Sequence, residues 1–360
     1  MAFYQCPNCK KIWQYPIEKC PDCFLNLERM KSEKIPAPKG TCSPLGKVVG
    51  VSKVQISTMF HPKTPYFVLL LEDKNGNKWV QKTVKEYKIG DLFKVEPCTD
   101  KKAVAIWRVK YDIFEAIERV IELLGGITPH QKSWWGAKIL ILPTLISPKH
   151  PHLAENTSPE FLESTIKHLL ENGAKIENIK VAGQSFDEIP IEASAQKSQL
   201  SKVCKEFNIL PINLAEKNFV RKDDLEVLEE VFSSDLIINL PILRIGKVSV
   251  GENLFKFLKK ENYLAQKYLS SDEEILKNLI NSLPEILTIA EANSVQKPDG
   301  FTAHLNLILA SFNPLNLDRI FFEITMEKNL PEILKGIKIE NIPIVGRTVE
   351  EVQSDAEKYD

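Results

Sequence analysis

The chain has 360 residues, of which 43% are hydrophobic and 26% are charged, and its formal net charge is −1. This composition excludes a disordered or collagen-like chain, and at roughly 100–200 residues per domain it predicts two or three domains. Apolar stretches such as 66–71 and 236–243 are too short to span a bilayer, and the first residues lack the apolar region of a signal peptide. We therefore expect a soluble, cytoplasmic protein without membrane contact.

The charge is unevenly distributed along the chain. Residues 1–110 contain 20 Lys and Arg against 10 Asp and Glu, a net +10, whereas the remaining residues carry −11. We expect a boundary near residue 110 and attraction of the basic segment for a polyanion or a phosphorylated ligand. Alternatively, the two halves attract each other across a domain interface.

Residues 1–35 contain two Cys-x-x-Cys knuckles separated by ten residues. Each knuckle turns two sulfurs toward one point, and the short spacer lets a hairpin bring the knuckles together. The pattern predicts a zinc ribbon with a four-thiolate site made by Cys6, Cys9, Cys20 and Cys23. Four protein ligands fill a tetrahedral sphere, so the zinc should be structural. A rubredoxin-type iron is the chemical alternative.

Residues 36–110 have the pattern of a small all-β domain. The strand-like segments are 47–57, 66–72, 78–84, 91–96 and 104–109. Asn75-Gly76 predicts a tight turn between the second and third segments. Five short strands that close on one another predict an OB-like barrel.

Residues 3–110 resemble the rubredoxin-like zinc ribbon and OB fold of domain-of-unknown-function family 35, which is found with thiolases and acyl-CoA enzymes. The resemblance is carried by the four ribbon cysteines, Lys47-Val48-Val49, Pro65-Tyr66-Phe67-Val68 and Lys88-Ile89-Gly90-Asp91. It implies binding of CoA or acyl-CoA beside an acyl-transfer partner enzyme. Lysine-rich strands are consistent with binding of the CoA phosphates.

Aromatic residues are interspersed with lysines between residues 11 and 88. OB barrels stack bases on exposed aromatic rings and follow the nucleic-acid backbone with cations. The alternative function is therefore a nucleic-acid-binding protein whose α/β partner domain is not catalytic. Where the aromatic rings fill the ribbon and barrel cores, this alternative does not hold.

Residues 111–347 alternate between helical and strand patterns. Expected strands are 138–142, 179–182, 209–213, 236–240, 286–290 and 305–310; expected helices are 112–124, 158–171, 197–207, 225–232, 272–282 and 313–323. The fold class predicted for the chain is therefore α/β, with a doubly wound, mainly parallel sheet preceded by the small all-β zinc ribbon and OB-like barrel. The charged segment 348–360 is expected to be a frayed tail.

Polar residues follow the predicted strands, and open α/β sheets bind ligands beyond the carboxyl ends of their strands. The candidates for ligand binding are Gly183, Gln184, Ser185 and Asn213, and those for catalysis are Asn239, Arg244, Asn253, Glu291, Asp299 and His304. Glu291 and Asp299 together could coordinate Mg²⁺ or share a proton, and His304 could act as an acid or base. Alternatively, the whole set consists of turn and cap residues.

The motif His150-Pro151-His152 resembles a metal-binding pair. A rigid x-Pro-x segment is expected to place its two outer side chains on opposite sides. We therefore predict that these histidines do not bind one metal ion together.

Residues 112–350 resemble domain-of-unknown-function family 362. The matching segments include Lys138–Pro143, Ala182–Ser185, Asp235–Pro241, Gly251–Phe255 and Gln296–Gly300. Arg244-Ile245-Gly246 stands where the family often has Lys-Thr-His, and Glu252 where it often has Lys. The resemblance implies no particular reaction, and whether the α/β domain is an enzyme stays open. We expect it to bind or act on a small acyl or anionic metabolite.

Overall fold

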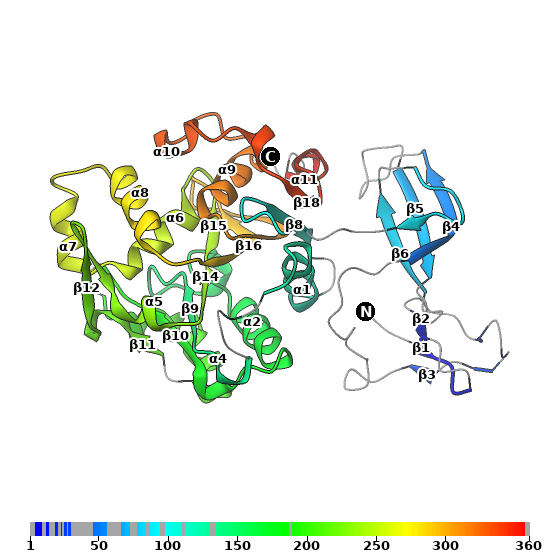
Figure 1. The fold of residues 1–360 in the computed structure, drawn as a ribbon, viewed down its shortest axis with the longest axis horizontal. Coiled ribbons are helices and arrows are strands. Elements are labelled where there is room, and N and C mark those ends of the chain that lie inside the picture. The colour runs from blue at the N-terminus through cyan, green and yellow to red at the C-terminus, as the bar shows by residue number, and fades with distance from the viewer. Residues whose placement is uncertain are drawn as a thin grey trace. The chain divides into compact units, whose positions relative to one another are not determined.

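The computed structural model describes residues 4–8, 12–13, 19–20, 23, 25–26, 28–29, 46–55, 66–72, 78–83, 86–93, 98–109, 112–127, 129, 134–186, 189–209 and 211–356. The chain divides into two compact units, Met1–Pro97 and Cys98–Asp360 (Figure 1). Cys9 and the Asn75-Gly76 turn lie outside the described residues. Within the described ranges, no helix combines the length and the apolar character needed to cross a membrane.

The N-terminal unit is built on one small sheet of short strands. These are β1 (Tyr4–Gln5), β2 (Ile12–Trp13), β3 (Glu28–Arg29), β4 (Gly46–Val54), β5 (Tyr66–Glu72), β6 (Lys78–Thr83) and β7 (Leu92–Phe93). Their order is β3-β1-β2-β6-β5-β4-β7. Phe67, Leu69 and Leu71 are buried at every second position of β5, as expected for a strand with one face on a core. The described strands form an open path from β3 to β7, so they do not close the predicted barrel.

The C-terminal unit is an α/β domain around one large mixed sheet. Its strands are β8 (Val104–Arg108), β9 (Ile139–Pro143), β10 (Ile179–Gly183), β11 (Ile212–Asn213), β14 (Leu236–Leu240), β15 (Ile242–Arg244), β16 (Leu287–Gln296), β17 (Thr302–Ser311) and β18 (Ile344–Gly346). The order is β11-β10-β9-β14-β16-β17-β8-β18, with β15 also beside β16. The strands are parallel except where β17 pairs with β16 and β8. The predicted α/β class with mostly parallel strands is confirmed at this level.

Helices lie around this sheet (Figure 1). They are α1 (Ile113–Leu123), α2 (Pro159–Glu171), α3 (Ile191–Lys197), α4 (Leu200–Glu206), α5 (Glu229–Ser233), α6 (Ser249–Leu254), α7 (Lys260–Gln266), α8 (Asp272–Ser282), α9 (Pro314–Ile324), α10 (Glu332–Lys335) and α11 (Val349–Ala356). α1 packs on α2 and α2 on α4, whereas α9 packs on α6, α10 and α11. The start of α1 follows the predicted cap, because the Asp112 side chain accepts a hydrogen bond from Phe114 N at 2.9 Å.

The helix predicted over 225–232 is wrong in its first half. Residues Leu225–Leu228 form strand β13, which pairs with β12 (Phe219–Lys222) in a separate two-stranded sheet. Apolar residues in a short segment fit either element, and here the pairing with β12 determines the conformation.

The strand predicted at 104–109 does not belong to the N-terminal unit. β8 lies between β17 and β18 in the large sheet, with Leu309 opposite Ile106 and Val345 opposite Ala105. The boundary between the units therefore falls after Pro97, earlier than the predicted residue 110. Ala103–Ile106 are all fully buried, which is typical of a strand covered on both faces.

The predicted frayed tail is partly a helix. Thr348 and Glu351 form a capping box at the start of α11: Glu351 N donates to Thr348 Oγ1 at 3.3 Å, and Thr348 N donates to Glu351 Oε2 at 3.4 Å. Val349 and Val352 are buried in a core cluster that includes Phe321. The spacing of Thr348 and Glu351 is that of a capping box, and the two valines are three residues apart. This pattern is typical of a helix start, although the segment is highly charged.

Candidate functional site

Three of the four predicted metal ligands meet in the N-terminal unit. The sulfur atoms of Cys6, Cys20 and Cys23 all lie within 4.8 Å of one another. Cys6 and Cys20 are fully buried, and Cys23 is half-buried. A tetrahedral ion with zinc–sulfur bonds of about 2.3 Å separates its sulfur ligands by about 3.8 Å, so this group fits a thiolate-bound metal.

Local hydrogen bonds form the second knuckle. Cys20 N donates to Leu25 O at 2.8 Å, and Lys19 and Asn26 form an antiparallel bridge around the turn that contains Cys23. Asn8 Nδ2 lies 3.5 Å from Cys23 Sγ. The backbone thus directs two cysteine side chains toward Cys6, as the Cys-x-x-Cys spacing predicts.

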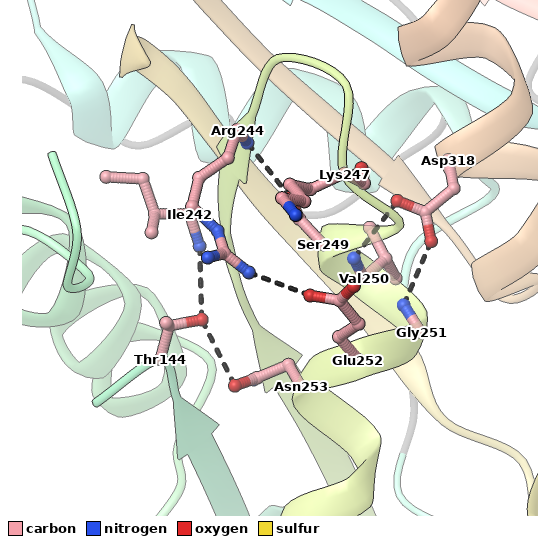
Figure 2. Close-up of polar contacts among 10 residues, drawn as sticks. All are labelled: Thr144, Ile242, Arg244, Lys247, Ser249, Val250, Gly251, Glu252, Asn253 and Asp318. Carbon is pink, nitrogen blue, oxygen red and sulfur yellow. Dashed lines mark hydrogen bonds and ion pairs between the residues drawn. The ribbon is translucent and has the colours of Figure 1, made fainter. Parts of the chain in front are cut away.

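In the α/β unit, the ends of β9 and β14 are joined to α6 by a buried polar network. Figure 2 shows its contact between Thr144 and Asn253. Asn253 Nδ2 donates to Asn239 Oδ1 at 2.8 Å and to Leu142 O at 3.1 Å, and Asn253 Oδ1 accepts from Thr144 Oγ1 at 3.1 Å. Asn239 Nδ2 contacts Val250 O at 3.3 Å. Asn239 is fully buried and Asn253 nearly so. The structure therefore brings these two candidates together, but their side-chain amides are hydrogen-bonded to other groups of the protein.

Asp318 on α9 anchors the beginning of α6. Its carboxylate accepts from Val250 N at 3.0 Å and from Gly251 N at 2.9 Å (Figure 2). Asp318 is fully buried, and burial raises its pKa to about 8, although both backbone N–H groups act in the opposite direction. A Cβ at Gly251 would lie 2.5 Å from Leu276 Cδ2 of α8, so a larger residue there would require the Leu276 side chain to shift. No sequence pattern indicated this role for Asp318, because its hydrogen-bond partners lie 68 and 67 residues earlier in the chain.

Glu291 binds the N-terminus of α2. It accepts from Ser158 N at 2.9 Å and from Ser158 Oγ at 2.6 Å. Helix N-termini at the edge of an open α/β sheet commonly receive anionic ligands. Here a carboxylate of the chain occupies that position. Burial raises the pKa of Glu291 to about 7, and the hydrogen bonds from Ser158 oppose this shift.

Asp299 does not join Glu291 in a common site. It lies in the turn between β16 and β17 and accepts from Phe301 N at 3.0 Å. Five residues of β16 follow Glu291 before this turn, which corresponds to roughly 16 Å of strand. The predicted Mg²⁺ pair is therefore not brought together.

The raised pKa of Glu291 predicts an unusual dependence of stability on pH. Between the ordinary value of 4.5 and about pH 7, folded Glu291 keeps its proton while the unfolded chain releases it. This contribution to folding is therefore full below pH 4.5 and is lost as the pH rises to about 7. Glu291→Gln removes the titration, so the free energy of unfolding of wild type minus that of the variant should fall by roughly 3 kcal/mol across this window.

Urea unfolding of both proteins at several pH values measures this difference, in which the other titrating groups cancel. A difference that is constant with pH would contradict the assignment of a protonated, buried Glu291.

Arg244 ends β15 and brings a positive charge to this region (Figure 2). A terminal nitrogen of its guanidinium donates to Glu252 Oε2 at 2.8 Å, and its backbone N donates to Ser249 Oγ at 3.0 Å. Arg244 Nε is buried and has no hydrogen-bond partner among the described residues. Glu252 and Arg244 are both departures from the resembled family, and here they form one ion pair.

Two of the predicted ligand-binding residues line a small apolar cavity. Gly183 and Asn213 are register partners on β10 and β11, and they border a cavity of about 50 Å³ together with residues of α3 and α4. A volume of this size holds a water molecule or two but no metabolite. Cys204 also borders it, and burial raises the pKa of its thiol to about 11.

The remaining candidates lie apart from this cavity. Gln184 is fully buried, and its Nε2 donates to Lys256 O at 2.6 Å and to Leu258 O at 2.5 Å, which holds the segment after α6. Ser185 follows it and is half-buried. His304 is exposed on β17, with its Nδ1 at 2.9 Å from Ser294 Oγ.

The expectation that His150 and His152 point to opposite sides is wrong. Their Nδ1 atoms are 2.8 Å apart, and their ring centroids are 4.8 Å apart. Pro151 begins a 3₁₀ turn over Pro151–Leu153 instead of continuing an extended segment, so both imidazoles lie on one side.

Comparison with protein-family models matches residues 139–249 to the domain of unknown function DUF362. The match covers less than a third of the chain and lies within the C-terminal unit. The matched segment begins with β9 and ends at Ser249, so it includes Asn239, Arg244 and the His150–His152 turn. Asn253, Glu291 and Asp318 lie beyond it. The resemblance predicted over 112–350 is confirmed for the matched part, and no curated protein matches the chain.

Proposed function

We propose that the N-terminal unit is a structural zinc module that binds an acyl-CoA-like or other anionic ligand, and that the unit with the DUF362 domain binds or acts on a small acyl or anionic metabolite. The observation that carries the proposal is the convergence of Cys6, Cys20 and Cys23 within 4.8 Å. Cys9 would complete a four-thiolate sphere, which leaves no open position and makes the metal structural.

The charge of the N-terminal unit supports an anionic ligand. Residues 1–97 contain 16 Lys and Arg against 9 Asp and Glu, a net +7. Lys47 and Lys53 are exposed on β4, and Lys88 is exposed in the segment before β7. Exposed cations on a small sheet attract phosphates such as those of CoA.

Arg244 supports an anionic metabolite in the α/β unit. A buried N–H without an acceptor is costly, and an oxygen of a carboxylate or phosphate would satisfy Arg244 Nε. The exposed Lys247 lies in the same connection between β15 and α6 and adds positive charge.

Calorimetric titration of the zinc-loaded full chain with CoA and acetyl-CoA tests the proposal. Exposed ion pairs are worth about 0.5–1 kcal/mol each, so the double variant Lys47→Gln, Lys53→Gln should bind CoA roughly tenfold more weakly. Arg244→Ala is the matched change in the other unit and should leave binding of CoA itself unchanged.

Absence of heat with both ligands at millimolar concentration would contradict the proposal. The same titration with single-stranded RNA at two salt concentrations examines the alternative function. RNA binding that weakens steeply with salt would favour a nucleic-acid-binding unit instead.

A further inference from the structure

His150 and His152 are nearly in place to chelate a metal ion. Their Nδ1 atoms are 2.8 Å apart and both side chains are exposed. With metal–nitrogen bonds of about 2.0–2.1 Å, two imidazole nitrogens on one ion lie about 2.9 Å apart at a right angle and about 3.3 Å apart at the tetrahedral angle. To admit an ion, the two nitrogens need to separate by a few tenths of an ångström, and both rings need to turn so that their lone pairs point toward it.

Hydrogen bonds hold the part of the loop that precedes His150, residues 146–149. Asn156 is nearly fully buried; its Oδ1 accepts from Ile146 N and its Nδ2 donates to Ser147 O, both at 2.8 Å. Glu155 accepts from Ser147 Oγ at 2.6 Å and from Lys149 Nζ at 2.7 Å. These contacts fix the backbone that leads into His150.

The side after the pair is tied to the β16–β17 hairpin. Thr302 Oγ1 donates to His152 O at 3.1 Å, and Gln296 Nε2 donates to Glu155 Oε1 at 3.1 Å. Ala154 is fully buried in a left-handed conformation with φ of 51°. Because the backbone is held on both sides, little conformational entropy is lost when the two imidazoles share an ion.

Gln199 lies beside Nε2 of His150, the ring nitrogen that does not face His152. Its Nε2 lies 3.2 Å from His150 Nε2. When His150 binds a metal through Nδ1, its Nε2 carries the proton, and rotation of the Gln199 amide presents Oε1 as the acceptor. Histidine ligands in metal sites commonly donate their other N–H to such an acceptor, which fixes the tautomer.

We propose that His150 and His152 form a binding site for a divalent transition-metal ion of the zinc, nickel or copper class, for which imidazole is a suitable ligand. Among the described residues, no third Cys, His, Asp or Glu joins the pair in a compact group of ligand atoms. The remaining coordination positions therefore face solvent and would take water or the oxygen of an anionic ligand. This site is separate from the cysteine group and does not depend on the function proposed above.

Titration with Ni²⁺ tests the site in the full chain loaded with a single equivalent of zinc, because that zinc occupies the thiolates and leaves the histidine pair open. Wild type should bind one equivalent of Ni²⁺, and loss of one of two linked ligands should weaken binding by roughly 100-fold in both His150→Ala and His152→Ala. Gln199→Ala should weaken it by roughly tenfold through loss of the acceptor. His304→Ala, which removes an exposed histidine outside the pair, is the matched control and should bind as wild type does.

Copper provides a second readout. The electron paramagnetic resonance spectrum of the Cu²⁺-loaded protein should show coupling to two imidazole nitrogens in wild type and to one in each single variant. Equal Ni²⁺ affinity of wild type and both single variants would overturn the proposal, as would a Cu²⁺ spectrum unchanged by either substitution.

Discussion

Replacing Cys20 with serine should unfold the N-terminal unit and leave the α/β unit folded. The Cys20 sulfur is fully buried and belongs to the group with Cys6 and Cys23. Structural zinc contributes about 10–16 kcal/mol of apparent binding free energy in small domains, and in these domains binding and folding are one process. Among the residues that the structure describes in this unit, the buried core is small and centred on residues such as Phe67 and Leu69, and we expect that it cannot replace that contribution.

Scanning calorimetry with zinc analysis measures this effect. The wild-type chain, with two compact units, should show two transitions, and Cys20→Ser should lose the one that belongs to the N-terminal unit together with the bound zinc. Cys98→Ser is the control, because Cys98 is a half-buried cysteine of the other unit. Metal-free protein that keeps both transitions unchanged would show that zinc is not structural.

Asp318→Ala should lower the free energy of unfolding of the α/β unit by about 3–5 kcal/mol. The substitution removes the acceptor of Val250 N and Gly251 N, and both of these residues are buried. Each buried N–H that is left without an acceptor lowers the free energy of unfolding by about 1–3 kcal/mol. The smaller side chain also leaves a cavity, which lowers it further. Asp318→Asn keeps one oxygen as an acceptor and should lose about half as much.

Urea denaturation followed by circular dichroism gives these free energies. Asp299→Ala provides the comparison, because Asp299 is exposed and accepts only from Phe301 N in a surface turn, so its loss should cost less than about 0.5 kcal/mol. If Asp318→Ala and Asp299→Ala were equally stable, Asp318 would not be the anchor of α6.

The local signals of the sequence predicted local structure well. Asp112 caps α1, Ser158 with Pro159 starts α2, and Asn313 with Pro314 starts α9. In each case, the residue that begins the helix satisfies backbone groups only two or three positions away. The cysteine knuckles were readable for the same reason, since a Cys-x-x-Cys turn places its own sulfurs.

Features that depend on contacts between residues far apart in the chain could not be predicted from the sequence. β8 has an apolar pattern that suits either unit, and only its pairing with β17, some two hundred residues later, assigns it to the large sheet. The Glu291 carboxylate meets Ser158 across 133 positions. A contact between two single residues that are distant in the chain produces no periodic pattern in the sequence, so it could not be predicted from periodicity.

For this protein, the sequence alone predicted the division into two parts, the cysteine ligands of the metal site and most helix starts, because these depend on side chains within a few residues of one another. The tertiary structure decided which polar residues form hydrogen bonds inside the fold, such as Asn239 and Asn253, and which stay exposed to solvent, such as His150 and His152. The physical reason is that a buried polar group must find a partner wherever the fold supplies one. The choice of that partner depends on packing between elements that are remote in the chain.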